Sequence, residues 1–146
     1  MSAREDTIQE FVRQWLRKGE ADLAAAEILL RADAPDYFPC AFHCQQAAEK
    51  LIKALLVERQ IEFRKTHDLE HLVALLGQVA PELQGKLAPC DWLTPFGIEF
   101  RYPGEYQEVD RATAKNALVE AQRVRDLVLR ALGPRDSTSQ VKASGA

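Results

Sequence analysis

The sequence lacks several features that define large classes of proteins. No apolar run approaches the roughly 18 to 20 residues needed to span a bilayer, and the opening MSAREDTIQE is charged where a secretory signal would be apolar. It contains no glycine-rich phosphate loop and no G-x-S-x-G motif, and no segment has the alternation of a strand. We therefore expect a cytoplasmic protein without membrane contact and without β-structure.

Cysteine is scarce, and its spacing excludes the usual cysteine chemistry. The chain has three cysteines and no C-x-x-C motif: Cys40 and Cys44 are one helical turn apart, and Cys90 stands alone. Cys40 and Cys44 flank His43, but positions one or three apart on a helix do not arrange a nucleophile, its base and an orienting group. Buried free thiols are the prediction, rather than a disulfide framework or a catalytic cysteine.

Histidine is equally scarce, which argues against a metal centre. Di-metal sites in helical bundles use paired Glu-x-x-His motifs, and this chain has none. Asp68-x-x-His71 occurs once and His67 is four residues before His71, but the spacing shows no further ligands. The pattern indicates a helix start with Asp68 near its positive end, and we expect no metal and no other cofactor.

The length and composition are typical of a single globular domain. Of 146 residues 47% are hydrophobic and 28% charged, with a net charge of -3, which disfavours a protein whose whole surface grips nucleic acid. Helical periodicity covers residues 7–32, 37 to about 59, 66–77, about 82–88 and 108–132, and an aromatic-rich irregular connection is expected over 89–107. The predicted fold is all-α, an antiparallel up-and-down bundle of four to five helices over 1–133, followed by a disordered polar tail, 134–146.

The second helix is the predicted centre of the bundle. One broad face is apolar, and the other carries polar residues, with His43 at the edge: Gln45, Gln46, Glu49, Lys50 and Lys53. His43, Gln46, Lys50 and Lys53 fall within roughly an 80° arc, an arrangement suited to a phosphate group or an acidic partner. The alternative is a solvated face with Glu49 and Lys53 as an i, i+4 pair.

Two further features are candidates for contacts. Phe42 projects from the polar side of the second helix, where a large aromatic either tucks under a loop or meets another chain, so it is the candidate for a dimer interface. Arg101, followed by Tyr102 and a proline, either anchors the loop through Asp22 or Glu49 or points toward a phosphate.

Several of these segments occur together in a known family. They are Trp15 with Ala21-Asp22-Leu23, the run Ala41-Phe42-His43-Cys44-Gln45-Gln46-Ala47-Ala48-Glu49-Lys50, then Thr66-His67-Asp68-Leu69, and finally Arg101-Tyr102-Pro103. In this order, across about residues 7–132, the chain resembles a HEPN domain (higher eukaryotes and prokaryotes nucleotide-binding). The resemblance implies an all-α bundle that forms a homodimer. Many members pair with a minimal nucleotidyltransferase, often as a toxin–antitoxin module.

Other HEPN proteins are metal-independent RNases with an Arg-x4-6-His motif at the start of the last helix. Arg101 is at the matching place, but no histidine follows it, and Arg64 and His71, which have the spacing, lie in the wrong segment. Without that histidine, acid–base assistance to a ribose 2′-hydroxyl is missing.

We therefore expect a dimeric, non-enzymatic partner of a nucleotidyltransferase that contributes to nucleotide binding. The alternatives are an RNase toxin that uses Arg101 and a stand-alone nucleotide-binding module. The candidates for nucleotide or partner contact are His43, Gln46, Lys50, Lys53, His67, Asp68, Arg101 and Tyr102.

Overall fold

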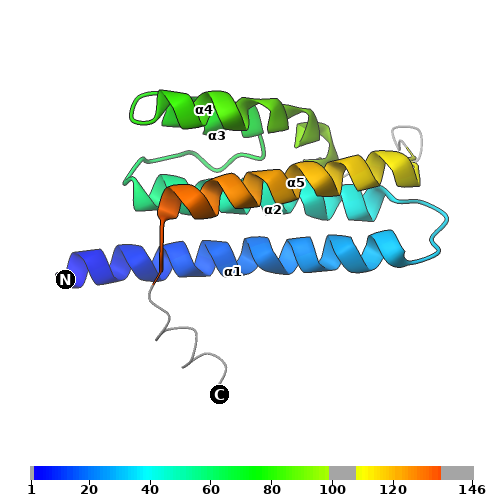
Figure 1. Cartoon of the computed structure of the whole chain (residues 1–146), viewed down its shortest axis with the longest axis horizontal. Helices are drawn as coiled ribbons and strands as arrows, with labels where there is room; N and C mark the ends of the chain where they lie inside the picture. The colour runs from blue at the N-terminus through cyan, green and yellow to red at the C-terminus, as the bar shows by residue number, and fades with distance from the viewer. Residues whose placement is uncertain (1, 99–107, 136–146) are drawn as a thin grey trace, which may run out of the picture.

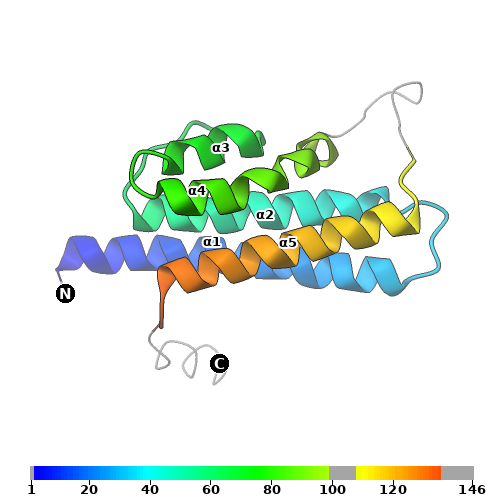
Figure 2. The same ribbon diagram turned by 45° about the horizontal axis from the view of Figure 1, so that its top comes forward.

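The computed structural model describes residues 2–98 and 108–135, and all its regular elements are helices. Three long helices lie side by side, and two short α-helices with a 3₁₀ helix form a second layer over α2 (Figures 1 and 2). In chain order the elements are α1 (Ala3–Arg31), α2 (Phe38–Glu58), α3 (Leu69–Leu76), α4 (Pro81–Leu87), the 3₁₀ helix η1 (Ala88–Gly97) and α5 (Arg111–Leu132). The all-α prediction is confirmed.

Helix α2 is the centre of the structure because other elements cover it on most sides. It packs against α1, α5, η1 and α3, and fourteen of its 21 residues are buried. Its small residues, Ala41, Ala47, Ala48 and Ala54, are fully buried and let a neighbouring helix approach closely. On α1, Gly19 serves the same purpose, since a Cβ there would lie 2.9 Å from Cγ of Leu51.

Aspartate side chains accept backbone hydrogen bonds at the starts of three helices, α2, α3 and α5. The sequence predicts the one at the start of α3. Asp68 accepts a hydrogen bond from the backbone N–H of His71 at 3.3 Å and caps α3. Asp36 accepts from the N–H groups of Phe38 (3.0 Å) and Val109 (3.1 Å). One carboxylate therefore ties the start of α2 to the segment that leads into α5.

The expected irregular connection is partly wrong. Residues 88–97 form a 3₁₀ helix that continues from α4. Cys90, Leu93 and Phe96 are three residues apart, so three residues per turn place them on one face, where Cys90 and Leu93 are fully buried. The rest of the predicted connection, 99–107, lies outside the described residues.

Two further observations concern the thiols and the apolar character of the helices. All three cysteines are free and buried, which confirms the prediction for the thiols. Within the two described ranges, no helix is both long and apolar enough to cross a bilayer.

Candidate functional site

The polar residues of α2 do not form one outer face, which corrects the prediction. Gln45 is 0%, Glu49 3% and Lys53 6% exposed. The reason is tertiary, because α1, α5, η1 and α3 all pack against this helix. Of the residues predicted for that outer face, only His43, Gln46 and Lys50 keep partial access to solvent.

One ionic cluster joins α1 to α2. Asp22 lies in the buried face of α1, and its carboxylate contacts Nδ1 of His43 at 2.8 Å and Nζ of Lys50 at 2.5 Å. His43 and Lys50 are seven residues apart, two turns along one side of α2. The Asp22 side chain is only 11% exposed, so two cationic or donor groups compensate the desolvation of its charge.

A second cluster surrounds Glu49, on another side of α2. Its carboxylate contacts Nδ1 of His67 at 2.6 Å and Nζ of Lys53 at 3.3 Å. Lys53 in turn lies over the rings of Trp15 (5.4 Å) and Phe63 (5.6 Å), a cation–π arrangement. The i, i+4 pair of the alternative is therefore present, but it is buried and not on a solvated face. Burial also keeps the Lys53 ammonium away from any external ligand.

His67 is the most accessible of the predicted site residues that lie in the described part of the chain. Its side chain is 60% exposed although Nδ1 is held by Glu49, so the opposite edge of the ring, with Nε2, faces away from the carboxylate. The backbone is held as well: the carbonyl of His67 accepts from Nε2 of Gln45 at 3.0 Å. Asp68, the next residue, is the cap of α3, which gives it a structural role.

The Gln45 side chain links this cluster to the end of η1. Its Oε1 accepts from Nε2 of Gln46 at 2.6 Å. Gly97 packs directly on the Gln45 amide, and a Cβ at residue 97 would overlap that side chain. The glycine is therefore favoured by space and not by backbone conformation, because a larger residue would have to displace the buried Gln45 amide.

Five accessible residues in the first part of α2 lie on one side of the helix, and we call them the open strip of α2: Pro39, Phe42, His43, Gln46 and Lys50. The Phe42 ring is partly buried against the core and lies edge-on to the His43 ring, with centroids 5.4 Å apart. The strip combines an aromatic, an imidazole, an amide and an ammonium group. Such a mixture suits a protein interface or a polar ligand.

Some predictions for the site lie beyond the described residues, and some features had no sequence signal. Arg101 and Tyr102 fall in 99–107, outside the described residues. Asp22 and Glu49, suggested as partners of Arg101, each contact a lysine and a histidine instead.

The Lys53 contact with Trp15 and Phe63 joins residues far apart in sequence, so periodicity could not predict it. Among the described residues no group of three or more potential ligands could hold a metal ion.

Comparison with known proteins places this arrangement in a family. A search among curated proteins found no match. The structure is similar to the crystal structure of ST0689, an archaeal HEPN homologue, with a TM-score of 0.61, 27% sequence identity, and coverage of 80% of this chain and 93% of that one. The family model of the HEPN domain matches residues 12–132, which include α2 and both ionic clusters. This chain belongs to the HEPN domain family.

Proposed function

We propose that this HEPN protein acts as the homodimeric partner of a minimal nucleotidyltransferase, in a toxin–antitoxin type module, and not as an RNase. The observation that carries the proposal is the absence of the histidine that HEPN RNases use. Helix α5 contains no histidine, and none follows Arg101 anywhere in the chain. An acid–base group at that position is what the RNase chemistry requires.

The remaining histidines are committed elsewhere. His43 and His67 each place Nδ1 on a carboxylate, of Asp22 and Glu49 respectively, and His71 lies in the first turn of α3. None of the three histidines belongs to α5, so none occupies the position of the RNase histidine. A binding role for the open strip of α2 needs no such group, and this supports a partner function.

A pull-down of the tagged protein from its native host tests the proposal. We expect a small nucleotidyltransferase to be recovered in near-equal amount, identified by mass spectrometry. Recovery of the protein alone would contradict the partner function.

An RNA-cleavage assay without added metal tests the alternative. We expect no cleavage by the purified protein. Metal-independent cleavage that disappears in Arg101→Ala would instead establish the RNase function, with Arg101 in its mechanism. A rise in melting temperature with a purine nucleotide would show nucleotide binding, since a ligand that binds only the folded state stabilises it.

A further inference from the structure

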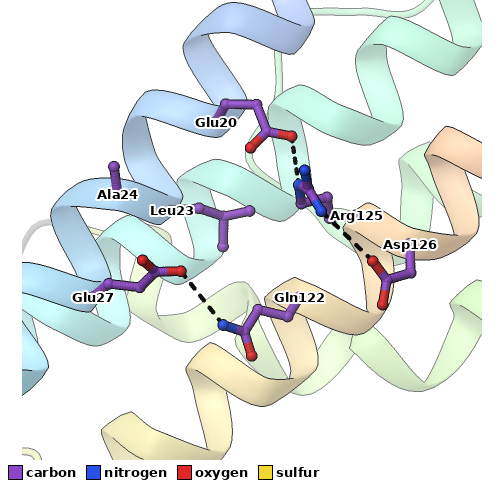
Figure 3. Close-up of a pocket in the computed structure, with 7 residues that line it drawn as sticks. All are labelled: Glu20, Leu23, Ala24, Glu27, Gln122, Arg125 and Asp126. Atoms are coloured by element: carbon purple, nitrogen blue, oxygen red, sulfur yellow. Dashed lines mark hydrogen bonds and ion pairs between the residues drawn. The ribbon is translucent and has the colours of Figure 1, made fainter.

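The described surface has a second notable feature, on the side where α1 and α5 run antiparallel (Figures 1 and 2). A hollow of about 460 Å³ lies between these helices, and we call it the α1–α5 groove. It is lined from α1 by Glu20, Leu23, Ala24 and Glu27, and from α5 by Gln122, Arg125 and Asp126 (Figure 3).

The lining is acidic, with three carboxylates and one guanidinium. Arg125 is already engaged: its Nε contacts Glu20 at 2.5 Å, and its Nη1 lies 3.7 Å from Asp126. Glu27 has only a hydrogen bond from the Gln122 amide, at 3.5 Å, and in the described part of the chain no cation lies within ion-pairing distance of it. The groove therefore has residual negative charge, concentrated on Glu27 and on the 57% exposed Asp126.

Exposed aliphatic side chains adjoin this charge. Ile28 is 61% and Val119 57% exposed. Ile28 follows Glu27, Val119 is one turn from Gln122, and Glu27 contacts Gln122. Both aliphatic residues therefore lie at the same end of the groove. Neither side chain lines the hollow itself, but both lie beside it, so an occupant wider than the hollow would cover them.

We infer that the α1–α5 groove is a docking surface for a positively charged amphipathic helix of another protein. Lysine or arginine side chains of that helix pair with Glu27 and Asp126, while its apolar side chains cover Ile28, Val119 and the Ala24 methyl group. Recognition of a groove by one face of an amphipathic helix is a recurrent mode of protein binding.

The net charge of the lining also disfavours a second copy of this chain as the occupant. A two-fold symmetric contact places the same patch of each subunit face to face. That arrangement would oppose two hollows that each contain three carboxylates and one guanidinium, and surfaces of the same net charge repel each other. The inference does not depend on which protein supplies the helix. Its test can therefore fail or succeed independently of the test of the nucleotidyltransferase proposal.

The test uses the full-length protein and a synthetic 18-residue helical peptide with leucines on one face and lysines on its flanks. Two comparison peptides have glutamate in place of lysine or a scrambled order. Fluorescence anisotropy measures affinity, and amide chemical-shift changes locate the site. We expect the basic peptide alone to bind and the shifts to fall on the groove residues.

Matched variants separate docking from general attraction to an acidic protein. Glu27→Lys/Asp126→Lys and Ile28→Ser/Val119→Ser should each weaken binding at least about tenfold, because they remove the charge and the apolar contact respectively. Glu82→Lys/Val79→Ser makes the same kinds of change on another exposed surface and should bind the peptide like the unaltered protein. All altered side chains are exposed, so unchanged melting curves will verify folding.

Several outcomes would overturn the inference. They are no binding of the basic peptide, equal binding of the acidic or scrambled peptide, equal loss in the Glu82/Val79 variant, and shift changes outside the groove. Self-association of the protein that the groove variants abolish would also overturn it, because the occupant would then be a second copy.

Discussion

At the scale of single residues, close packing occurs at positions that have no special signal in the sequence. Gly97 and Gln45 occupy adjoining space at the end of η1, and Gln45 is fully buried. By contrast, Gly85 in α4 has open space where its Cβ would be. The two glycines therefore provide a matched pair for testing the packing of the Gln45 amide.

Replacing Gly97 with alanine should destabilise the protein by about 1–3 kcal/mol, because the new methyl group displaces a buried amide from its hydrogen bonds. Gly85→Ala should have the opposite sign and stabilise by about 0.5–1 kcal/mol, since alanine favours a helix. Urea denaturation measures both. Equal effects of the two substitutions would mean that the Gln45 contact is not needed for stability.

Because of Cys90, the free energy of unfolding is expected to decrease at alkaline pH. Burial raises the pKa of its thiol from the ordinary 9.0 to about 12, and the Glu120 carboxylate adds to the shift. The unfolded thiol ionises above about pH 9 and the folded one does not, so unfolding is favoured increasingly up to about pH 12. The contribution is fully present below pH 9 and is lost as the pH rises.

The free energy of unfolding should fall by up to about 1.4 kcal/mol per pH unit from this residue alone. Urea titrations at pH 8, 9.5 and 10.5 will compare the unaltered protein with Cys90→Ala, which should show a shallower decline. Parallel declines would contradict the assignment to Cys90. Cys44, whose pKa is also raised by its hydrogen bond with Cys40 and by burial, is unchanged in both proteins.

At the scale of elements, the contact between α1 and α2 combines small residues with one buried carboxylate. Gly19 on α1 and the buried alanines of α2 allow the helices to approach. Asp22 then engages His43 and Lys50 across the interface. Packing of the small residues sets the distance between α1 and α2. The contacts of the Asp22 carboxylate favour one alignment of the two helices along their axes.

Asp22→Asn should lower the free energy of unfolding by about 2 kcal/mol, because it leaves the partly buried Lys50 without a counter-charge. The matched control is Glu10→Gln, which removes the exposed pair with Arg13 on the same helix and should cause no measurable change. Thermal and urea melts of both variants provide the measurement. A similar effect of the two substitutions would show that burial of Asp22 has no special energetic role.

At the scale of the whole molecule, two surfaces with different chemistry are available for assembly. The open strip of α2 is mixed polar and aromatic, and the α1–α5 groove is acidic and has exposed aliphatic residues beside it. The first suits the homodimer expected of the family, and the second suits a basic partner. Separate surfaces would let both contacts exist together.

If the open strip of α2 forms the dimer, Phe42→Glu should yield monomers in multi-angle light scattering, since a charge would replace an aromatic side chain at the interface. Phe11→Glu is the control, because Phe11 is 51% exposed on α1, and it should leave the mass unchanged. A Phe42→Glu dimer with unaltered mass would place the interface elsewhere.

The prediction of helices from sequence succeeded where periodicity was long. The three long helices bury stripes of residues three and four apart, a signal carried by each segment alone. The 3₁₀ helix was missed because its ten residues, with Pro89 and Pro95, carry a short three-residue repeat. Free buried cysteines were also predictable, since odd number and spacing exclude a disulfide framework.

The sequence by itself determined the helical class, the position of Asp68 at the start of α3, the absence of an RNase histidine and the resemblance to the HEPN family. Tertiary structure alone decided which polar residues of α2 are accessible, because burial depends on how many neighbours surround a helix, and a single helical pattern cannot count them. It also decided the pairing of Asp22 and Glu49 with their histidines and lysines. The α1–α5 groove has the same origin, since its carboxylates come from two helices that meet only in the folded chain.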